Sequence, residues 1–279
     1  MTTSDLDQAT QDSREEQSVT SRDGTRIAFD RLGTGPAVIL VGGATMTRQG
    51  NAPLAEALAG DFTVLNYDRR GRGGSGDTLP YSLEREFEDI EALITAAGGS
   101  AHLYGISSGG ALALEAAAAG LPIDRVAVYE VPYGLSEEQP RQQAEYVANL
   151  ERAAQEGPGA RMEVFLRVVG ADDDAIAATR NSDAWPGLVA VEHTLAYDAA
   201  SMGTGQPPVD RLGKITIPTL VLTGAPAGEH EVGSAAFFDA AAEAIAAAVP
   251  SAEHRRIPGQ THAVDPQALA PMLSAFYQG

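Results

Sequence analysis

Cysteine is absent from the 279 residues of this sequence. Its absence excludes a disulfide framework, a thiol nucleophile and a thiolate metal site. Long apolar runs are also lacking, because no stretch approaches the roughly 18 uninterrupted apolar residues of a membrane-spanning helix. The polar N-terminus has no apolar core of the kind that a signal peptide carries. We therefore expect a cytoplasmic protein.

The sequence also lacks clustered positive charge. The chain has 19 Lys and Arg against 38 Asp and Glu, which gives a formal net charge of -19 at pH 7. Binding to a phosphate backbone or an anionic membrane surface needs clustered basic side chains. We therefore expect no nucleic-acid partner and no membrane partner, and we expect the negative charge to favour solubility.

Common metal and nucleotide motifs are missing as well, including HExxH, the EF-hand loop and the P-loop. Residues 71–76 formally match the dinucleotide pattern GxGxxG. A dinucleotide turn should open directly into a helix, whereas the residues that follow, DTLP, are typical of a loop. No cofactor and no metal ion are therefore expected.

Short β-rich runs alternate with helical segments along most of the chain. This order is typical of an α/β fold with a mostly parallel sheet that helices cover on both faces. The pattern predicts about eight strands, at residues 19–21, 26–30, 37–41, 62–67, 102–105, 125–131, 218–223 and 253–257. Helices are predicted at residues 53–59, 82–97, 108–119, 234–248 and 266–277.

The alternation is interrupted between residues 132 and 211. This segment has no strand signal but several amphipathic stretches, and it is too long for a loop. We predict a helical cap at residues 132–211, inserted into an α/β core of residues 18–131 and 212–279. Residues 1–17 are polar and acidic, and they are predicted to form a disordered tail.

Ser107 lies at the centre of a GxSxG pentapeptide, residues 105–109, between an apolar run and an alanine-rich run. A serine on a sharp strand-to-helix turn has strained backbone angles, and small flanking residues avoid collisions with the strand and the helix. This context makes Ser107 a candidate nucleophile.

Four segments, in this order, resemble the motifs of the α/β-hydrolase fold superfamily. Residues 38–44, which end in GGA, resemble its oxyanion turn, and residues 67–75 (YDRRGRGGS) resemble its arginine- and glycine-rich loop. Residues 105–109 resemble its nucleophile elbow, and residues 258–262 (PGQTH) resemble its histidine loop. The resemblance covers roughly residues 22–277 and implies a serine hydrolase with a helical cap.

The resemblance also implies roles for single residues. A serine hydroxyl needs a neighbouring base, and His262, in the loop after the last predicted strand, is the best candidate. The amides of Ala44 and Ser108 correspond to the two donors of the oxyanion hole. The family usually has His-Gly in this turn, where this chain has Gly42-Gly43, so the contacts that support the donors must differ.

The acid that orients the histidine is less clear from the residues. The family usually supplies it in the loop after the seventh predicted strand, where this chain has Ala227, followed by Glu229 and Glu231. Some members supply it at the end of the preceding strand, where this chain has Glu130. A carboxylate within an apolar run needs a partner to offset its desolvation. This favours Glu130, with Glu229 and Glu231 as the alternative acids.

The predicted cap carries large aromatic residues, of which Tyr133, Tyr146 and Trp185 are candidates to line the substrate pocket or to pack the cap on the core. We expect hydrolysis of a small or medium carboxylic ester, lactone or thioester through an acyl-enzyme. Alternatives are amide or carbon–carbon bond hydrolysis, perhydrolysis, or a non-catalytic ligand-binding member of the fold. The expected partner is thus a small acyl compound, and nothing in the sequence indicates an oligomeric state.

Overall fold

The computed structural model describes residues 16–225 and 232–279. Within them eight strands form one sheet in the order β1-β2-β4-β3-β5-β6-β7-β8. The pairs β1/β2 and β2/β4 are antiparallel, and the remaining neighbours are parallel. The strands are β1 (Glu16–Thr20), β2 (Arg26–Leu32), β3 (Ala37–Val41), β4 (Thr63–Tyr67), β5 (Ala101–Ile106), β6 (Ile123–Tyr129), β7 (Thr219–Ala225) and β8 (Ala252–Pro258). The predicted α/β fold with a mostly parallel sheet is confirmed.

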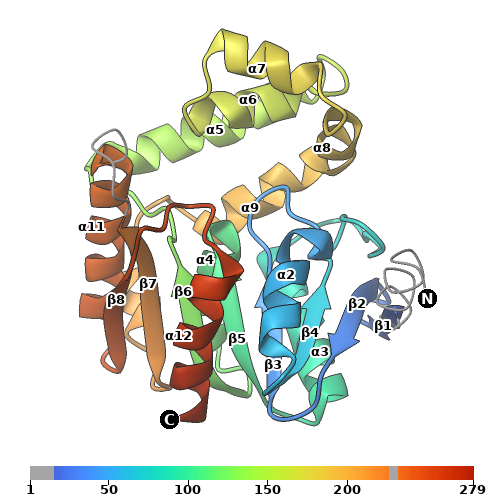
Figure 1. Cartoon of the computed structure of the whole chain (residues 1–279). Helices are drawn as coiled ribbons and strands as arrows, with labels where there is room; N and C mark the ends of the chain where they lie inside the picture. The colour runs from blue at the N-terminus through green and yellow to red at the C-terminus, as the bar shows by residue number, and fades with distance from the viewer. Residues whose placement is uncertain (1–15, 226–231) are drawn as a thin grey trace, which may run out of the picture.

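Helices cover both faces of this sheet (Figure 1). Helices α2 (Arg48–Leu58) and α12 (Pro266–Gln278) pack on one face, and α3 (Leu83–Ala97), α4 (Ser108–Ala118) and α11 (Val232–Ala248) pack on the other. Because successive strand residues point to opposite faces, Val38 and Leu40 of β3 join the first layer, while Ile39 and Val41 join the second. Strand β3 is therefore apolar on both sides.

Helix α2 begins at Arg48, five residues before the predicted start at residue 53. The prediction placed Pro53 at the helix start, but Pro53 lies inside the helix. The backbone N–H of Arg48 donates to Asp68 Oδ1 over 2.7 Å, so a carboxylate that follows β4 satisfies an N–H of the first turn. This stabilising contact comes from a distant part of the chain and has no local sequence signal.

Helices occupy each amphipathic stretch between β6 and β7. They are α5 (Gln139–Ala153), α6 (Ala160–Val168), α7 (Asp173–Arg180), α8 (Trp185–Val191), a short 3₁₀ turn (Glu192–Thr194), α9 (Leu195–Met202) and α10 (Val209–Leu212). Figure 1 shows α5 to α8 beyond one end of the sheet, while α9 runs back toward α4. We call α5 to α10 the helical insertion, and its assignment as a cap stays a prediction.

The N-terminal boundary differs from the expectation. Glu16 and Gln17 belong to β1, where they pair with Asp30 and Phe29 of β2, although the sequence placed them in the disordered tail. Their alignment with β2 provides the backbone partners that a tail would lack. The rest of the predicted tail lies outside the described residues. No helix in the described part of the chain is long and apolar enough to span a bilayer.

Candidate active site

Three non-glycine residues with a positive φ lie beyond the carboxyl-terminal edge of the sheet. Thr45, Ser107 and Glu130 have φ values of 62°, 55° and 46°, and they are the only non-glycine residues at positive φ within residues 16–225 and 232–279. They follow β3, β5 and β6, which are neighbours in the sheet. Such conformations cost on the order of 1–3 kcal/mol each and cluster at functional sites, where the surrounding structure imposes them. This edge is therefore the candidate active site.

Ser107 forms the turn between β5 and α4, with φ 55° and ψ -129°. A Cβ on Gly105 would lie 2.4 Å from the Gly109 carbonyl oxygen, and a Cβ on Gly109 would lie 2.5 Å from that of Gly42. Both flanking glycines are thus required for the close approach of strand, helix and oxyanion turn. Although Ser107 has the N-cap position of α4, its side chain makes no capping hydrogen bond. The hydroxyl is not engaged by the helix that follows it.

Glu130 and His262 lie in direct contact. Oε2 of Glu130 is 2.8 Å from Nδ1 of His262, and Oε1 accepts the backbone N–H of Gly224 over 2.9 Å. The Glu130 side chain is 3% exposed, whereas that of His262 is 46% exposed. An imidazole that donates Nδ1–H to this carboxylate keeps a lone pair on Nε2, which is the form a general base requires.

The register of the sheet places Ser107 beside Glu130. Ile106 of β5 pairs with Tyr129 of β6, and the N–H of Ser107 donates to the Tyr129 carbonyl over 3.0 Å. Ser107 and Glu130 are the next residues on the two strands, so they leave the sheet side by side. The structure thus brings together the serine and the histidine–glutamate pair that the sequence singled out.

The loop that carries His262 is held from two sides. Tyr129 Oη donates to the Thr261 carbonyl over 2.6 Å. Burial, together with the nearby Glu130 charge, raises the pKa of the Tyr129 phenol, so this hydroxyl stays protonated and remains a donor. On its other side the imidazole stacks on Phe238 of α11, with ring centroids 4.9 Å apart. Neither support was predicted from the sequence.

Replacing Gly224 with alanine should displace this histidine loop, because the new Cβ would lie 2.3 Å from the Gln260 carbonyl oxygen. A shift of about 1 Å in a catalytic group lowers turnover by about 100-fold, so we expect a loss of that order in kcat. Gly60→Ala is the matched control, since its Cβ would have nothing within 4 Å. Steady-state kinetics of both variants check this, and a Gly224→Ala protein with wild-type kcat would contradict it.

The predicted oxyanion turn lies against the elbow. A Cβ on Gly43 would be 3.1 Å from the Ser107 Cβ, so Ala44 follows a residue in contact with the nucleophile. Ser108 is the first residue of α4, where backbone N–H groups lack helical partners and favour negative charge. In place of the family's usual histidine, Arg69 and Arg72 donate to the carbonyls of Gly42 (3.3 Å) and Gly43 (2.6 Å).

The three aromatic candidates for the pocket have different settings. Tyr133 is 0% exposed and packs in the core beside α4. The prediction that it lines the pocket is therefore wrong. Its ring is enclosed by apolar side chains and solvent does not reach it. Tyr146 and Trp185 are only partly buried, and they belong to the same apolar cluster as Ala44. That cluster joins the helical insertion to the oxyanion turn.

The remaining residues singled out in the sequence either have a structural role or lie outside the described residues. Glu229 and Glu231, the alternative acids, fall outside the described residues. The glycine-rich loop is held by Asp68, whose Oδ2 accepts the Gly74 N–H over 2.8 Å, and the next helix starts only at Leu83. In the two described ranges no group of three His, Asp or Glu side chains is arranged to hold a metal ion.

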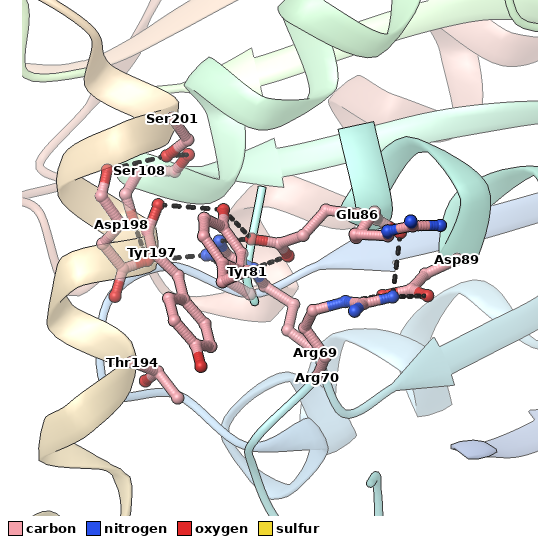
Figure 2. A network of polar contacts seen from close by, with 12 residues as sticks. Arg69, Arg70, Tyr81, Glu86, Asp89, Ser108, Thr194, Tyr197, Asp198 and Ser201 are labelled. Carbon is pink, nitrogen blue, oxygen red and sulfur yellow. Dashed lines mark hydrogen bonds and ion pairs between the residues drawn. The ribbon is translucent and has the colours of Figure 1, made fainter. Parts of the chain in front are cut away.

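A buried ionic network beneath the oxyanion turn was not predicted from the sequence (Figure 2). Asp198 of α9 accepts from Arg69 Nη1 and Arg72 Nη2 over 2.7 Å each, and from Ser108 Oγ over 2.8 Å. The other side of Arg69 binds both carboxylate oxygens of Glu86, over 2.6 and 2.7 Å. Burial alone would raise the pKa of Asp198, but the charges of Arg72 and Arg69 hold it below its usual value. The aspartate is therefore ionised.

Comparison with known proteins agrees with this geometry. A model of the alpha/beta hydrolase family matches residues 38–272. The structure is similar to that of an alpha/beta hydrolase from Sphaerobacter thermophilus, with 45% identity, a TM-score of 0.78, and coverage of 94% of this chain and 100% of the other.

Two further solved structures share the fold at lower identity. A thermophilic esterase from Thermogutta terrifontis has 24% identity and a TM-score of 0.69, over 95% of this chain and 98% of the other. The enol-lactonase from Burkholderia xenovorans has 20% identity and a TM-score of 0.67, over 94% of this chain and 100% of the other. On the family match and the 45% identity together, the chain belongs to the alpha/beta hydrolase family.

Proposed function

We propose that this protein is a serine hydrolase that cleaves a small or medium carboxylic ester, lactone or thioester through an acyl-enzyme. The observation that carries the proposal is the 2.8 Å contact between Glu130 and His262 beside the strained elbow of Ser107. A nucleophile, a base and an orienting carboxylate on three neighbouring segments are the parts that acyl transfer needs.

In the first half of the reaction, Ser107 Oγ attacks the acyl carbon while Nε2 of His262 removes its proton. Glu130 keeps Nδ1 protonated and stabilises the imidazolium that forms. The carbonyl oxygen becomes negative and is bound by the backbone N–H groups of Ala44 and Ser108, each worth on the order of 10²–10³ in rate. His262 then gives its proton to the leaving alcohol or thiol.

In the second half, water attacks the acyl group on Ser107. His262 accepts a proton from the water, and the same two N–H groups bind the oxygen. His262 then returns the proton to Ser107 Oγ as the acyl bond breaks, which releases the acid product and restores Ser107. Every step uses groups that this edge of the sheet supplies.

The substrate class is supported by the surroundings of the turn. Tyr146 and Trp185 pack in one apolar cluster with Ala44, which favours an acyl side that is apolar and bounded by bulky rings. Apolar surroundings favour a hydrocarbon acyl chain, and the rings limit its length. The names esterase and enol-lactonase belong to two of the similar structures, and they make esters and lactones the first compounds to test.

A fluorophosphonate probe and a graded ester series test this function. We expect stoichiometric labelling of wild-type protein, and none in the Ser107→Ala and His262→Ala variants. Nitrophenyl esters from acetate to decanoate should be hydrolysed, with kcat/KM falling at the longer chains. A wild-type protein that binds acyl compounds tightly but is neither labelled nor active would instead be a non-catalytic member of the fold.

A further inference from the structure

The inference concerns the peptide that joins Gly43 to Ala44. A trans peptide is planar, so its C=O and its N–H point in roughly opposite directions as one rigid unit. Whatever holds the Gly43 carbonyl therefore also aims the Ala44 N–H. Glycine at position 43 leaves this peptide without the side chain that would restrict its rotation. The orientation of the donor must come from contacts elsewhere.

Arg72 provides the main contact, beside the Met46 N–H, which donates to the same Gly43 carbonyl over 3.3 Å. Arg72 Nη1 donates to the Gly43 carbonyl over 2.6 Å, Nη2 donates to Asp198 over 2.7 Å, and Nε donates to Thr194 Oγ1 over 3.1 Å. All three guanidinium nitrogens thus have partners, and the side chain is 1% exposed. A buried, fully bonded guanidinium is rigid, and its charge makes the bond to the carbonyl a strong one.

Asp198 makes this arrangement possible. Together with Glu86, which pairs with Arg69, it balances the charges of two neighbouring guanidinium groups, those of Arg69 and Arg72, which would otherwise repel each other in a buried site. It also accepts from the side chain of Ser108, the residue with the second oxyanion N–H, while Ser201 Oγ on the same helix lies 3.3 Å from the Ser108 carbonyl oxygen. Figure 2 shows Asp198 and Ser201 on α9 beside Ser108. Helix α9 therefore contacts Arg72, which holds the first donor, and Ser108, which carries the second.

We propose that Arg72, held by Asp198 of α9, is a positioning residue that fixes the Gly43–Ala44 peptide with its N–H directed at the transition-state oxyanion. The inference rests on the proposed serine-hydrolase function, because this oxyanion forms only when Ser107 attacks an acyl carbon. Without Arg72 the peptide can rotate and turn its carbonyl toward the site. The donor would then be lost for the transition state, while the ground-state substrate, held by its acyl group, would bind as before.

The test compares Arg72→Met with Arg70→Met in the full-length protein. Loss of one oxyanion donor costs about 100-fold in kcat, so we expect that loss for Arg72→Met, with KM changed by less than about threefold. The affinity for a trifluoromethyl ketone, whose adduct with Ser107 carries an oxyanion, should fall by a similar factor. Arg70 is 0% exposed and also paired with carboxylates, Asp89 and Asp23, so its loss should lower thermal stability comparably and leave kcat within about threefold.

Asp198→Asn is the second variant, and it decides the matter if Arg72→Met does not fold. The amide keeps the shape but removes the charge that holds Arg72, and we expect about a tenfold loss in kcat with an unchanged KM. A kcat for Arg72→Met no lower than that for Arg70→Met, or a wild-type kcat for Asp198→Asn, would overturn the inference while labelling of Ser107 still stood. An unlabelled, inactive wild-type protein would overturn the proposed function and the inference with it.

Discussion

Replacing Ser107 with alanine should lower kcat by about a millionfold, the loss seen when the nucleophile of a serine hydrolase is removed. The reason is chemical, because Ser108, the other serine at this turn, is buried and its hydroxyl donates to Asp198. Alanine keeps the Cβ and the same positive-φ backbone, so the turn gains no new collision. The measurement is a single-turnover and steady-state assay on the best ester of the graded series.

Thermal unfolding of the same variant is the control. We expect its midpoint to stay close to that of the wild type, since Ser107 makes no capping hydrogen bond that the substitution would remove. Turnover above about 1% of the wild-type value would contradict an acyl-enzyme on Ser107, because the residual rate from the oxyanion hole and binding alone is far lower.

Replacing Glu130 with glutamine should cost on the order of 10⁴ in kcat. The N–H of Gly224 donates to Oε1 and requires an acceptor there, so the new amide would direct its NH₂ group at His262 Nδ1. Nδ1 would become an acceptor, the proton would move to Nε2, and the imidazole could no longer accept the proton of Ser107. The pH dependence of kcat/KM should change together with its magnitude.

Glu115→Gln is the matched control for this substitution. Glu115 is also a buried carboxylate, paired with Arg211 over 2.7 Å, but it lies about two turns along α4 from Ser108 and should affect stability alone. If Glu130→Gln kept wild-type turnover while Glu229→Gln or Glu231→Gln lost it, one of those two residues would be the acid instead.

The fold could be predicted because its signals are local. Strand β3, for example, is an apolar run that is buried on both faces, and Gly42 and Gly43 follow it before the next helix. The errors occurred where a distant group decides a boundary. Arg48 starts α2 because its N–H donates to Asp68, which follows the neighbouring strand β4. Glu16 joins β1 because Asp30 of β2 lies opposite. Neither partner can be identified from neighbouring residues.

Within the site, one rule applies both to a residue that was predicted and to one that was missed. Glu130 was chosen because a carboxylate in an apolar run needs a partner, and the structure places His262 Nδ1 and the Gly224 N–H on its two oxygens. Asp198 lies in a similar setting within LAYDAAS, and the same rule would have identified it. Its partners, Arg69 and Arg72, are more than 120 residues away in sequence, so only the folded chain reveals what it binds.

Two parts of the helical insertion should tolerate substitution to different degrees. Tyr146 and Trp185, on α5 and α8, belong to the apolar cluster that Ala44 also joins, and substitutions there should reshape the acyl site without touching the donors. Asp198 on α9 is bonded to the arginines that carry the oxyanion turn. New specificities in this lineage should therefore arise along α5 to α8, and libraries built to broaden its substrates should vary those helices and leave α9 intact.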